Sequence, residues 1–168
     1  MSDVLARWNG LSREEAAKEI LPCCGSKAWA DGMAKRRPLF DKMAVLAGSD
    51  ETWRRLMEAD WIEAFHGHPR IGESRAGATT PAQSLAWSSA EQQKVTGDAV
   101  KAALAEANRE YENRFGHIFI VCATGKSGPE ILEILRRRLE NDKETELREA
   151  TEQQRQITQI RLKKWLSQ

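Results

Sequence analysis

One short apolar run limits the fold of this chain more than any other feature of the sequence. Residues 118–123 (IFIVCA) lie between Gly116 and Gly125, and they have the pattern of a buried strand or of another buried extended segment. A strand must pair its backbone groups with those of a second strand, and no second run of this kind occurs. We therefore expect an extended segment that passes through a helical core, in an all-α fold.

Helix start and stop signals divide most of the remaining chain. Ser12 and Glu15 form a capping box, Gly48 is expected to end one helix, and Asp50 is expected to cap the next. The predicted helices cover residues 12–20, 26–35, 39–47, 51–59, 61–66, about 88–115, 129–140 and 142–165, and a long loop is predicted over residues 68–86. Seven or more helices in 168 residues predict one compact domain over residues 1–168.

The composition argues against several classes of protein. The 26 Lys and Arg residues nearly balance the 25 Asp and Glu residues, and a formal net charge of +1 does not support a nucleic-acid binder or a polybasic membrane binder. No run approaches the length of a membrane span, and the first ten residues lack the pattern of a secretory signal. Three cysteines, with Cys23 and Cys24 adjacent, fit a reducing compartment, and residues 166–168 are not a peroxisomal Ser-Lys-Leu signal. We expect a soluble, cytoplasmic protein.

Arg161 is the most informative single residue of the last predicted helix. Leu147, Ala150, Gln154 and Ile157 share one helical face, and Arg161 falls on the same face. A guanidinium that points into a core needs an anion or several acceptors, because removing it from water is costly. The alternatives are a structural ion pair, or a side chain whose stem packs while its charged end reaches water.

His68 follows a predicted helix end and precedes Pro69, so its backbone is expected to be extended and stiff. An imidazole presented in this way on a long loop can act as a general acid or base near neutral pH. The alternative is a loop histidine without a role. His66 and His68 together are a weak signal for zinc, because no cysteine or carboxylate ligand is placed with them.

Glu91 also has two interpretations. As the third residue after Ser88 it completes a capping box, which needs only the backbone amide of Ser88 as a partner. As a functional group, a carboxylate at a helix start can accept hydrogen bonds from an amide-rich ligand, while the free amides of the first turn donate to ligand oxygens.

Two further motifs do not support a function. Gly125, Lys126 and Ser127 resemble the end of a phosphate-binding loop, but Ile120 stands where the motif requires its first glycine. The basic run at residues 136–138 has glutamates nearby, and we expect it to form a solvated helix face.

Several short strings occur together and in a characteristic order. They are LPCCGS at residues 21–26, HPRIGE at 68–73, WSSAEQ at 87–92, Asn108 with Tyr111, RFG at 114–116, the run at 118–123, ND at 141–142, and Ile157-Thr158 followed by Arg161-Leu162. In this combination the chain resembles the 2-oxo-4-hydroxy-4-carboxy-5-ureidoimidazoline (OHCU) decarboxylases of the urate-to-allantoin pathway. The resemblance extends over nearly the whole sequence.

The resemblance implies a compact all-α fold, usually a homodimer, that converts OHCU to (S)-allantoin without a metal or an organic cofactor. It implies that His68 is the catalytic histidine, and that Glu91 and Arg161 also act on the substrate. The other residues that it places at the substrate are Pro69, Ser88, Ser89, Ala90, Gln92, Ile118, Phe119, Ile120, Val121 and Cys122. The expected ligand is a small ureide; nucleic acid and membrane are not expected partners.

Two other functions remain open on the residues alone. The first is a different lyase or hydrolase of ureide or purine catabolism, which would keep Glu91 and Arg161 as readers of amides and anions. The second is a non-catalytic helical module that binds a partner protein. Such a module needs neither the stiff His68-Pro69 segment nor an inward-facing Arg161, so these two features favour an enzyme.

Overall fold

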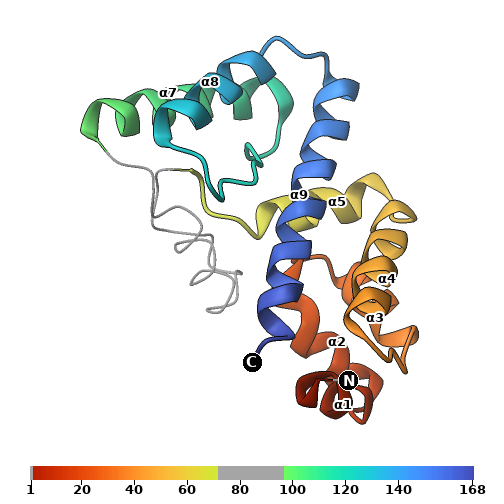
Figure 1. Ribbon diagram of the computed structural model, residues 1–168. Coiled ribbons are helices and arrows are strands. Elements are labelled where there is room, and N and C mark those ends of the chain that lie inside the picture. Colours follow the sequence, from red (N-terminus) through yellow and green to blue (C-terminus); the bar gives the residue numbers. More distant parts are fainter. Residues whose placement is uncertain (1, 72–96) are drawn as a thin grey trace. The chain divides into compact units, whose positions relative to one another are not determined.

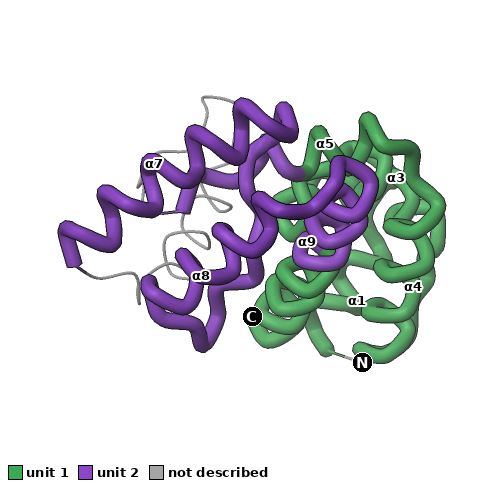
Figure 2. Tube along the Cα trace, turned by 90° about the horizontal axis from the view of Figure 1, so that it is seen from above, with its two compact units in different colours: residues 1–64, 155–168 green, residues 65–154 purple. Residues whose placement is uncertain are grey.

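The computed structural model describes residues 2–71 and 97–168, and Figure 1 shows the helices found there. Within these two ranges the chain forms eight α-helices and one short 3-10 helix, and it forms no strand. The predicted all-α class is therefore confirmed. Figure 2 colours two compact units, unit 1 (residues 1–64 and 155–168) and unit 2 (residues 65–154). The single domain expected over residues 1–168 stays a prediction.

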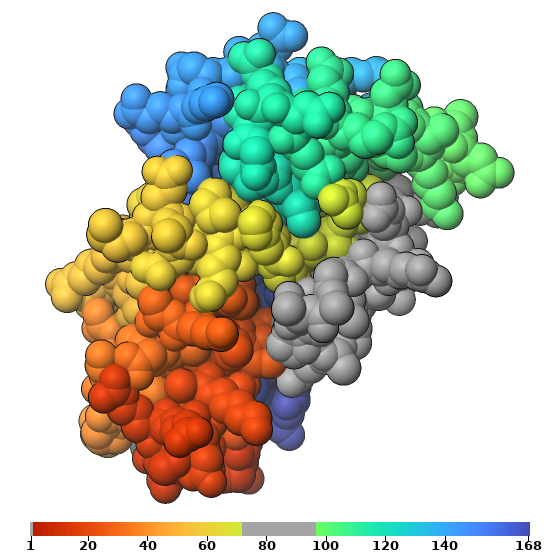
Figure 3. All heavy atoms as spheres, turned by 180° about the vertical axis from the view of Figure 1, so that it is seen from behind, coloured from red at the N-terminus to blue at the C-terminus, as the bar shows by residue number. Residues whose placement is uncertain are grey.

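Unit 1 begins with α1 (Asp3–Asn9), α2 (Arg13–Ile20), the 3-10 helix η1 (Leu21–Cys23) and α3 (Lys27–Lys35). It continues with α4 (Lys42–Arg54), most of α5 (Glu58–His66) and the C-terminal part of α9 (Lys143–Trp165). The predicted capping box is present, since Ser12 and Glu15 each hydrogen-bond the backbone amide of the other. Figure 3 shows the red and orange segments, α1 to α3, packed together at the surface of this unit.

Tryptophan side chains fill the core of unit 1 and direct their N–H groups to defined acceptors. Trp8 is fully buried, donates from Nε1 to the carbonyl oxygen of Ala16 at 2.9 Å, and meets the ring of Trp165 edge-on at 5.5 Å. Trp29, also fully buried, donates to the hydroxyl of Ser49 at 3.2 Å. Each large ring thus buries apolar surface without leaving its polar atom unsatisfied.

The sequence-based prediction fails at Gly48. A single helix, α4, runs through this glycine, whereas helices ending at Gly48 and beginning after Asp50 were expected. Asp50 does not act as a cap; it accepts hydrogen bonds from Arg155 and Gln159 of α9. A glycine inside a helix costs only about 1 kcal/mol, which tertiary contacts can offset.

Two smaller differences concern helix starts. α1 was not predicted, although Ser2 caps it with a hydrogen bond to the amide of Leu5. α5 begins at Glu58 and not after Asp60, whose carboxylate accepts from the amide of Met57 instead.

Unit 2 contains α7 (Asp98–Phe115), α8 (Gly128–Arg138) and the N-terminal part of α9. α7 ends at Gly116, whose φ of 79° is the left-handed conformation that glycine adopts without strain. Ser127 caps α8, and Asp142 accepts from the amide of Thr145 at the start of α9, so the starts predicted for these two helices are confirmed.

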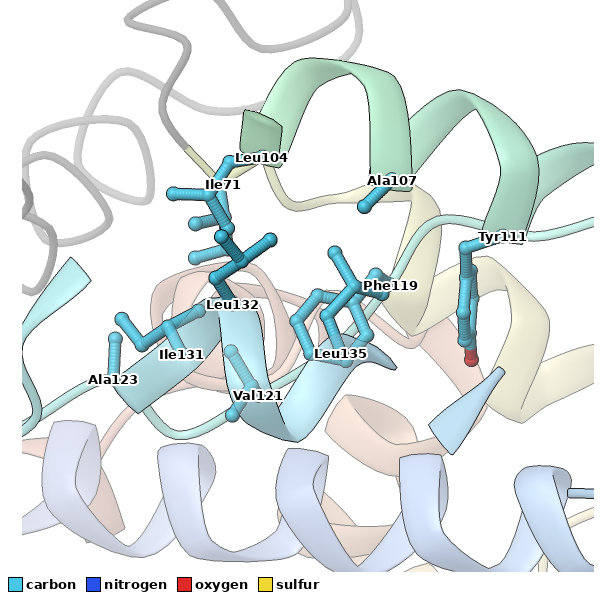
Figure 4. Packing of buried hydrophobic residues seen from close by; sticks show 10 residues of the cluster. All are labelled: Ile71, Leu104, Ala107, Tyr111, Phe119, Val121, Ala123, Ile131, Leu132 and Leu135. Carbon is cyan, nitrogen blue, oxygen red and sulfur yellow. The ribbon is translucent and has the colours of Figure 1, made fainter. Parts of the chain in front are cut away.

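The apolar run at residues 118–123 passes between helices of unit 2 as an extended segment. Figure 4 shows side chains of this segment packed with those of α7 and α8. The buried members of this cluster are Ile71, Leu104, Ala107, Tyr111, Phe119, Val121, Ala123, Ile131, Leu132 and Leu135. The predicted buried extended segment in a helical core is therefore confirmed.

Candidate functional site

His68 lies in unit 2 in the turn that follows α5. Its amide donates to the carbonyl oxygen of Phe65 at 3.2 Å, and its side chain is buried, with 7% exposed. The ring atom Nε2 is 2.7 Å from Oε1 of Gln154 on α9. Because a helix side chain meets the imidazole directly, the ring is held in one orientation. A loop histidine without a functional role would not need a buried hydrogen-bond partner.

The backbone that follows His68 is fastened to α7 at two points. Asn108 donates from Nδ2 to the carbonyl oxygen of Ile71 at 3.2 Å, and the Arg70 guanidinium pairs with the Glu112 carboxylate at 2.8 Å. Pro69, which lies between His68 and Arg70, is buried. The stiff segment expected from the sequence is thus reinforced by tertiary contacts.

The extended segment in unit 2 is held by side chains in place of a neighbouring strand. Gln153 accepts from the amide of Cys122 at 2.8 Å, and the Lys126 ammonium donates to the Cys122 carbonyl oxygen at 2.8 Å. Arg138 donates to the carbonyl oxygen of Ile120 at 2.5 Å. These contacts hold the backbone of residues 120–122 in place and satisfy the Cys122 amide and the carbonyl oxygens of Ile120 and Cys122.

Arg138 also belongs to a buried polar cluster in unit 2. Its guanidinium pairs with the carboxylate of Glu146, and it lies over the ring of Phe119 at 4.6 Å. The Tyr111 hydroxyl also donates to Glu146, and burial is the main cause that raises the pKa of this phenol. Asn141 donates to the other carboxylate oxygen at 3.0 Å.

This cluster corrects one sequence-based interpretation. The basic run at residues 136–138 was expected to form a solvated face, but Arg138 is only 1% exposed. Arg136 and Arg137 do face solvent. A useful signal was present, because Glu146 precedes Ala150 by one helical turn and shares its face of α9, where a buried carboxylate needs a cation.

Arg161 is buried in unit 1, with 1% exposed, as its position on the helical face predicted. Its Nη1 donates to the carbonyl oxygen of Pro22 in η1 at 3.4 Å. Its positive charge also acts on the thiols of Cys23 and Cys24. Burial outweighs that charge and raises the pKa of Cys24 to about 12, and it raises the pKa of Cys23 as well. Both thiols are therefore neutral at physiological pH and poor nucleophiles.

The remaining predicted site residues form one stretch of the sequence. Ser88, Ser89, Ala90, Glu91 and Gln92 lie outside the described residues, as does most of the predicted loop at 68–86. His68 and the 118–122 backbone are described in unit 2, and Arg161 is described in unit 1. Helical periodicity places Gln154 on the inward face of α9 but does not connect it with His68. A polar side chain on that face is the only available signal.

The described residues also bear on two other types of site. Over residues 2–71 and 97–168, no three His, Cys, Asp or Glu side chains are grouped so that they could hold a metal ion. Over the same two ranges, no helix combines the length and the apolar character that crossing a membrane requires.

Comparison with known proteins decides the family. A family model described as OHCU decarboxylase matches residues 9–163 of the chain. The chain belongs to the OHCU decarboxylase family. Members of this family are carboxy-lyases, and the match includes most of both described ranges, from residue 9 to 71 and from 97 to 163.

Individual relatives agree with this membership. A crystal structure of OHCU decarboxylase in the presence of (S)-allantoin is 34% identical, with a TM-score of 0.77 over 89% of this chain and 98% of that one. The uric acid degradation bifunctional protein TTL of Arabidopsis thaliana is 35% identical over 165 residues, which are 94% of this chain. The chain spans about half of that curated relative, 49% of its length. A crystal structure of (S)-allantoin synthase, at 17% identity and a TM-score of 0.71 over 96% of this chain and 53% of that one, shows the same fold.

Proposed function

We propose that this chain decarboxylates OHCU to (S)-allantoin in urate catabolism. The observation that carries the proposal is the match of the OHCU decarboxylase family over residues 9–163. The buried His68, held by Gln154 beside a stiff backbone, supplies a titratable group suited to the reaction. The neutral, buried Cys23 and Cys24 thiols argue against thiolate nucleophiles at these two positions.

The substrate can supply the electron sink that decarboxylation needs. When the C–C bond to the carboxylate breaks, its electron pair forms a double bond to the neighbouring ring carbon, and the π pair of the adjacent C=N bond moves to nitrogen, which takes up a proton. The hydroxyl group then loses its proton as a carbonyl forms, and the ring carbon gains a proton on one face. The protein needs only to orient the carboxylate out of the ring plane and to move these protons, and we propose that it uses no cofactor.

We propose His68 as the acid/base group for these proton transfers. Glu91 would accept hydrogen bonds from ureido or ring N–H groups, and Ser88 and Gln92 would complete the hydrogen bonding at the start of their helix. Pro69, Ser89 and Ala90 would contact the substrate as well.

Arg161 and the extended segment complete the assignment. A tight clamp by Arg161 on the departing carboxylate would stabilise the ground state and slow the reaction. We therefore propose that its guanidinium stabilises the ring carbonyl oxygen that is conjugated with the C=N bond, where negative charge grows. Backbone groups of Ile118, Phe119, Ile120, Val121 and Cys122 would bind the substrate amides.

The setting of the enzyme is part of the same proposal. We propose one catalytic domain over residues 1–168, which acts as a cytoplasmic homodimer. The three cysteines, of which Cys23 and Cys24 are adjacent, fit a reducing compartment and so support the cytoplasmic part of this proposal.

Circular dichroism during OHCU decay tests the function. OHCU also decays without a catalyst to racemic allantoin. The chain should accelerate the decay and leave an optically active product with the sign of (S)-allantoin. Decay at the uncatalysed rate, or a racemic product, would overturn the proposal.

A further inference from the structure

The side chain of Gln154 contacts the imidazole of His68. Its Oε1 is 2.7 Å from Nε2 of His68, and the glutamine is fully buried. Gln154 belongs to α9. The preceding residue of this helix, Gln153, accepts a hydrogen bond from the amide of Cys122 at 2.8 Å. One turn of α9 therefore contacts both the histidine and the extended backbone of unit 2.

The chemistry of the contact fixes more than the orientation of the ring. An amide oxygen can only accept a hydrogen bond, so Nε2 of His68 must carry the proton that it donates. A neutral imidazole has a single N–H group, and its lone pair then lies on Nδ1. The other tautomer would place two acceptors against each other at 2.7 Å.

We infer that Gln154 is a positioning residue that holds His68 as the Nε2–H tautomer, with Nδ1 as the nitrogen that exchanges protons with the substrate. This inference rests on the proposed function, because it takes His68 as the acid/base group. An uncharged acceptor orients the ring without adding a negative charge beside the carboxylate that the substrate must lose. A glutamate at this position would orient the ring equally well but would oppose substrate binding by repulsion.

The test compares two variants of Gln154. Gln154→Met keeps the length of the side chain but removes the acceptor. It should lower kcat roughly 10- to 100-fold, by analogy with the loss of partners that orient metal-ligating histidines, with little change in KM. Gln154→Glu restores an acceptor oxygen, so it should recover much of the kcat while raising KM. Wild-type kcat in Gln154→Met, or failure of Gln154→Glu to exceed Gln154→Met in kcat, would overturn the inference.

A matched control lies on the same helix. Gln159 donates to the Leu46 carbonyl oxygen at 3.0 Å and to Asp50 at 2.7 Å, so Gln159→Met also removes a partly buried amide from α9. It should keep the wild-type kcat. An equal loss of kcat in Gln159→Met would show that Gln154 acts through general helix stability, and this result would also overturn the inference.

A spectroscopic measurement separates this inference from the proposed function. Nitrogen-15 NMR of the wild-type chain distinguishes the two tautomers of His68 without any turnover. A protonated Nε2 supports the inference, and a protonated Nδ1 overturns it, whatever the activity. The turnover assay makes the same separation. An inactive His68→Asn beside a fully active Gln154→Met would reject only the positioning role of Gln154, whereas a fully active His68→Asn would reject the acid/base role of His68.

Discussion

Arg138 and Glu146 form an ion pair in unit 2 from which water is excluded, with 1% and 0% of their side chains exposed. Each charge satisfies the other, and Arg138 also donates to the Ile120 carbonyl oxygen. A single charge left in such a place has no compensation, because water cannot reach it. The pair therefore links the stability of α8 and α9 to the position of the extended segment.

Removing one member of this pair should be strongly destabilising. Arg138→Met leaves the carboxylate of Glu146 buried without its cation, so we expect the free energy of unfolding to fall by about 3–5 kcal/mol. The exposed pair of Arg148 and Glu144, with 74% and 77% exposed, provides the control. Arg148→Met should cost less than about 1 kcal/mol. Denaturant titration of both variants measures the difference, and equal losses would contradict the buried pair.

A second prediction concerns His117 and the pH dependence of stability. Burial among Phe65, Tyr111 and Phe115 lowers the pKa of His117 below its ordinary value of 6.5, and the nearby charges of Arg138 and His66 act in the same direction. Between the folded and the unfolded pKa, the unfolded chain binds more protons. Acidification from pH 7.5 through 6.5 should therefore weaken the fold.

The variant His117→Phe should remove this part of the pH dependence. Its free energy of unfolding should fall less than that of the wild type between pH 7.5 and 5.5. His66→Gln changes an exposed histidine whose charge is the smallest of the influences on the pKa of His117, so it serves as the control, with a slope close to that of the wild type expected. If the free energy of unfolding depended on pH in the same way for the wild type and His117→Phe, burial would not lower the pKa of this imidazole.

Two helix glycines of unit 1 should respond in opposite directions to alanine. A Cβ at Gly32 would lie 2.6 Å from Cγ2 of Thr52, so α3 and α4 could not keep their separation. At Gly48 the nearest atom would be Cδ of the flexible Arg36 side chain, at 3.4 Å. Gly48→Ala should thus be neutral or stabilise the fold by up to about 1 kcal/mol. Gly32→Ala should destabilise it by about 1–3 kcal/mol.

A third variant identifies the cause. Thr52→Ser removes the methyl group but keeps the hydroxyl that bonds to Gly48 and Arg36. Combined with Gly32→Ala, it should recover most of the loss in thermal or denaturant unfolding. If the double variant were as unstable as Gly32→Ala alone, the contact with Thr52 would not be the reason for glycine at this position.

The sequence predicted the elements that local signals determine. Ser12 caps a helix where expected, the last helix begins after Asp142 as expected, and the lone apolar run is extended and buried. Local signals failed at Gly48 and Asp50, where tertiary partners on other helices override them. They also could not pair Arg138 with Glu146 or His68 with Gln154, because such pairs depend on how distant segments fold together. The burial of Arg161 was predictable, because helical periodicity alone places it on the same face of α9 as Ala150 and Ile157.

The most direct test of the account is the turnover of OHCU by His68→Asn, followed by circular dichroism beside the wild type. Asparagine keeps a polar group near Gln154 but cannot transfer protons near neutral pH. The variant should still bind allantoin, and it should lose roughly two or more orders of magnitude in rate. Turnover close to that of the wild type, with the same optically active product, would contradict the central role of His68.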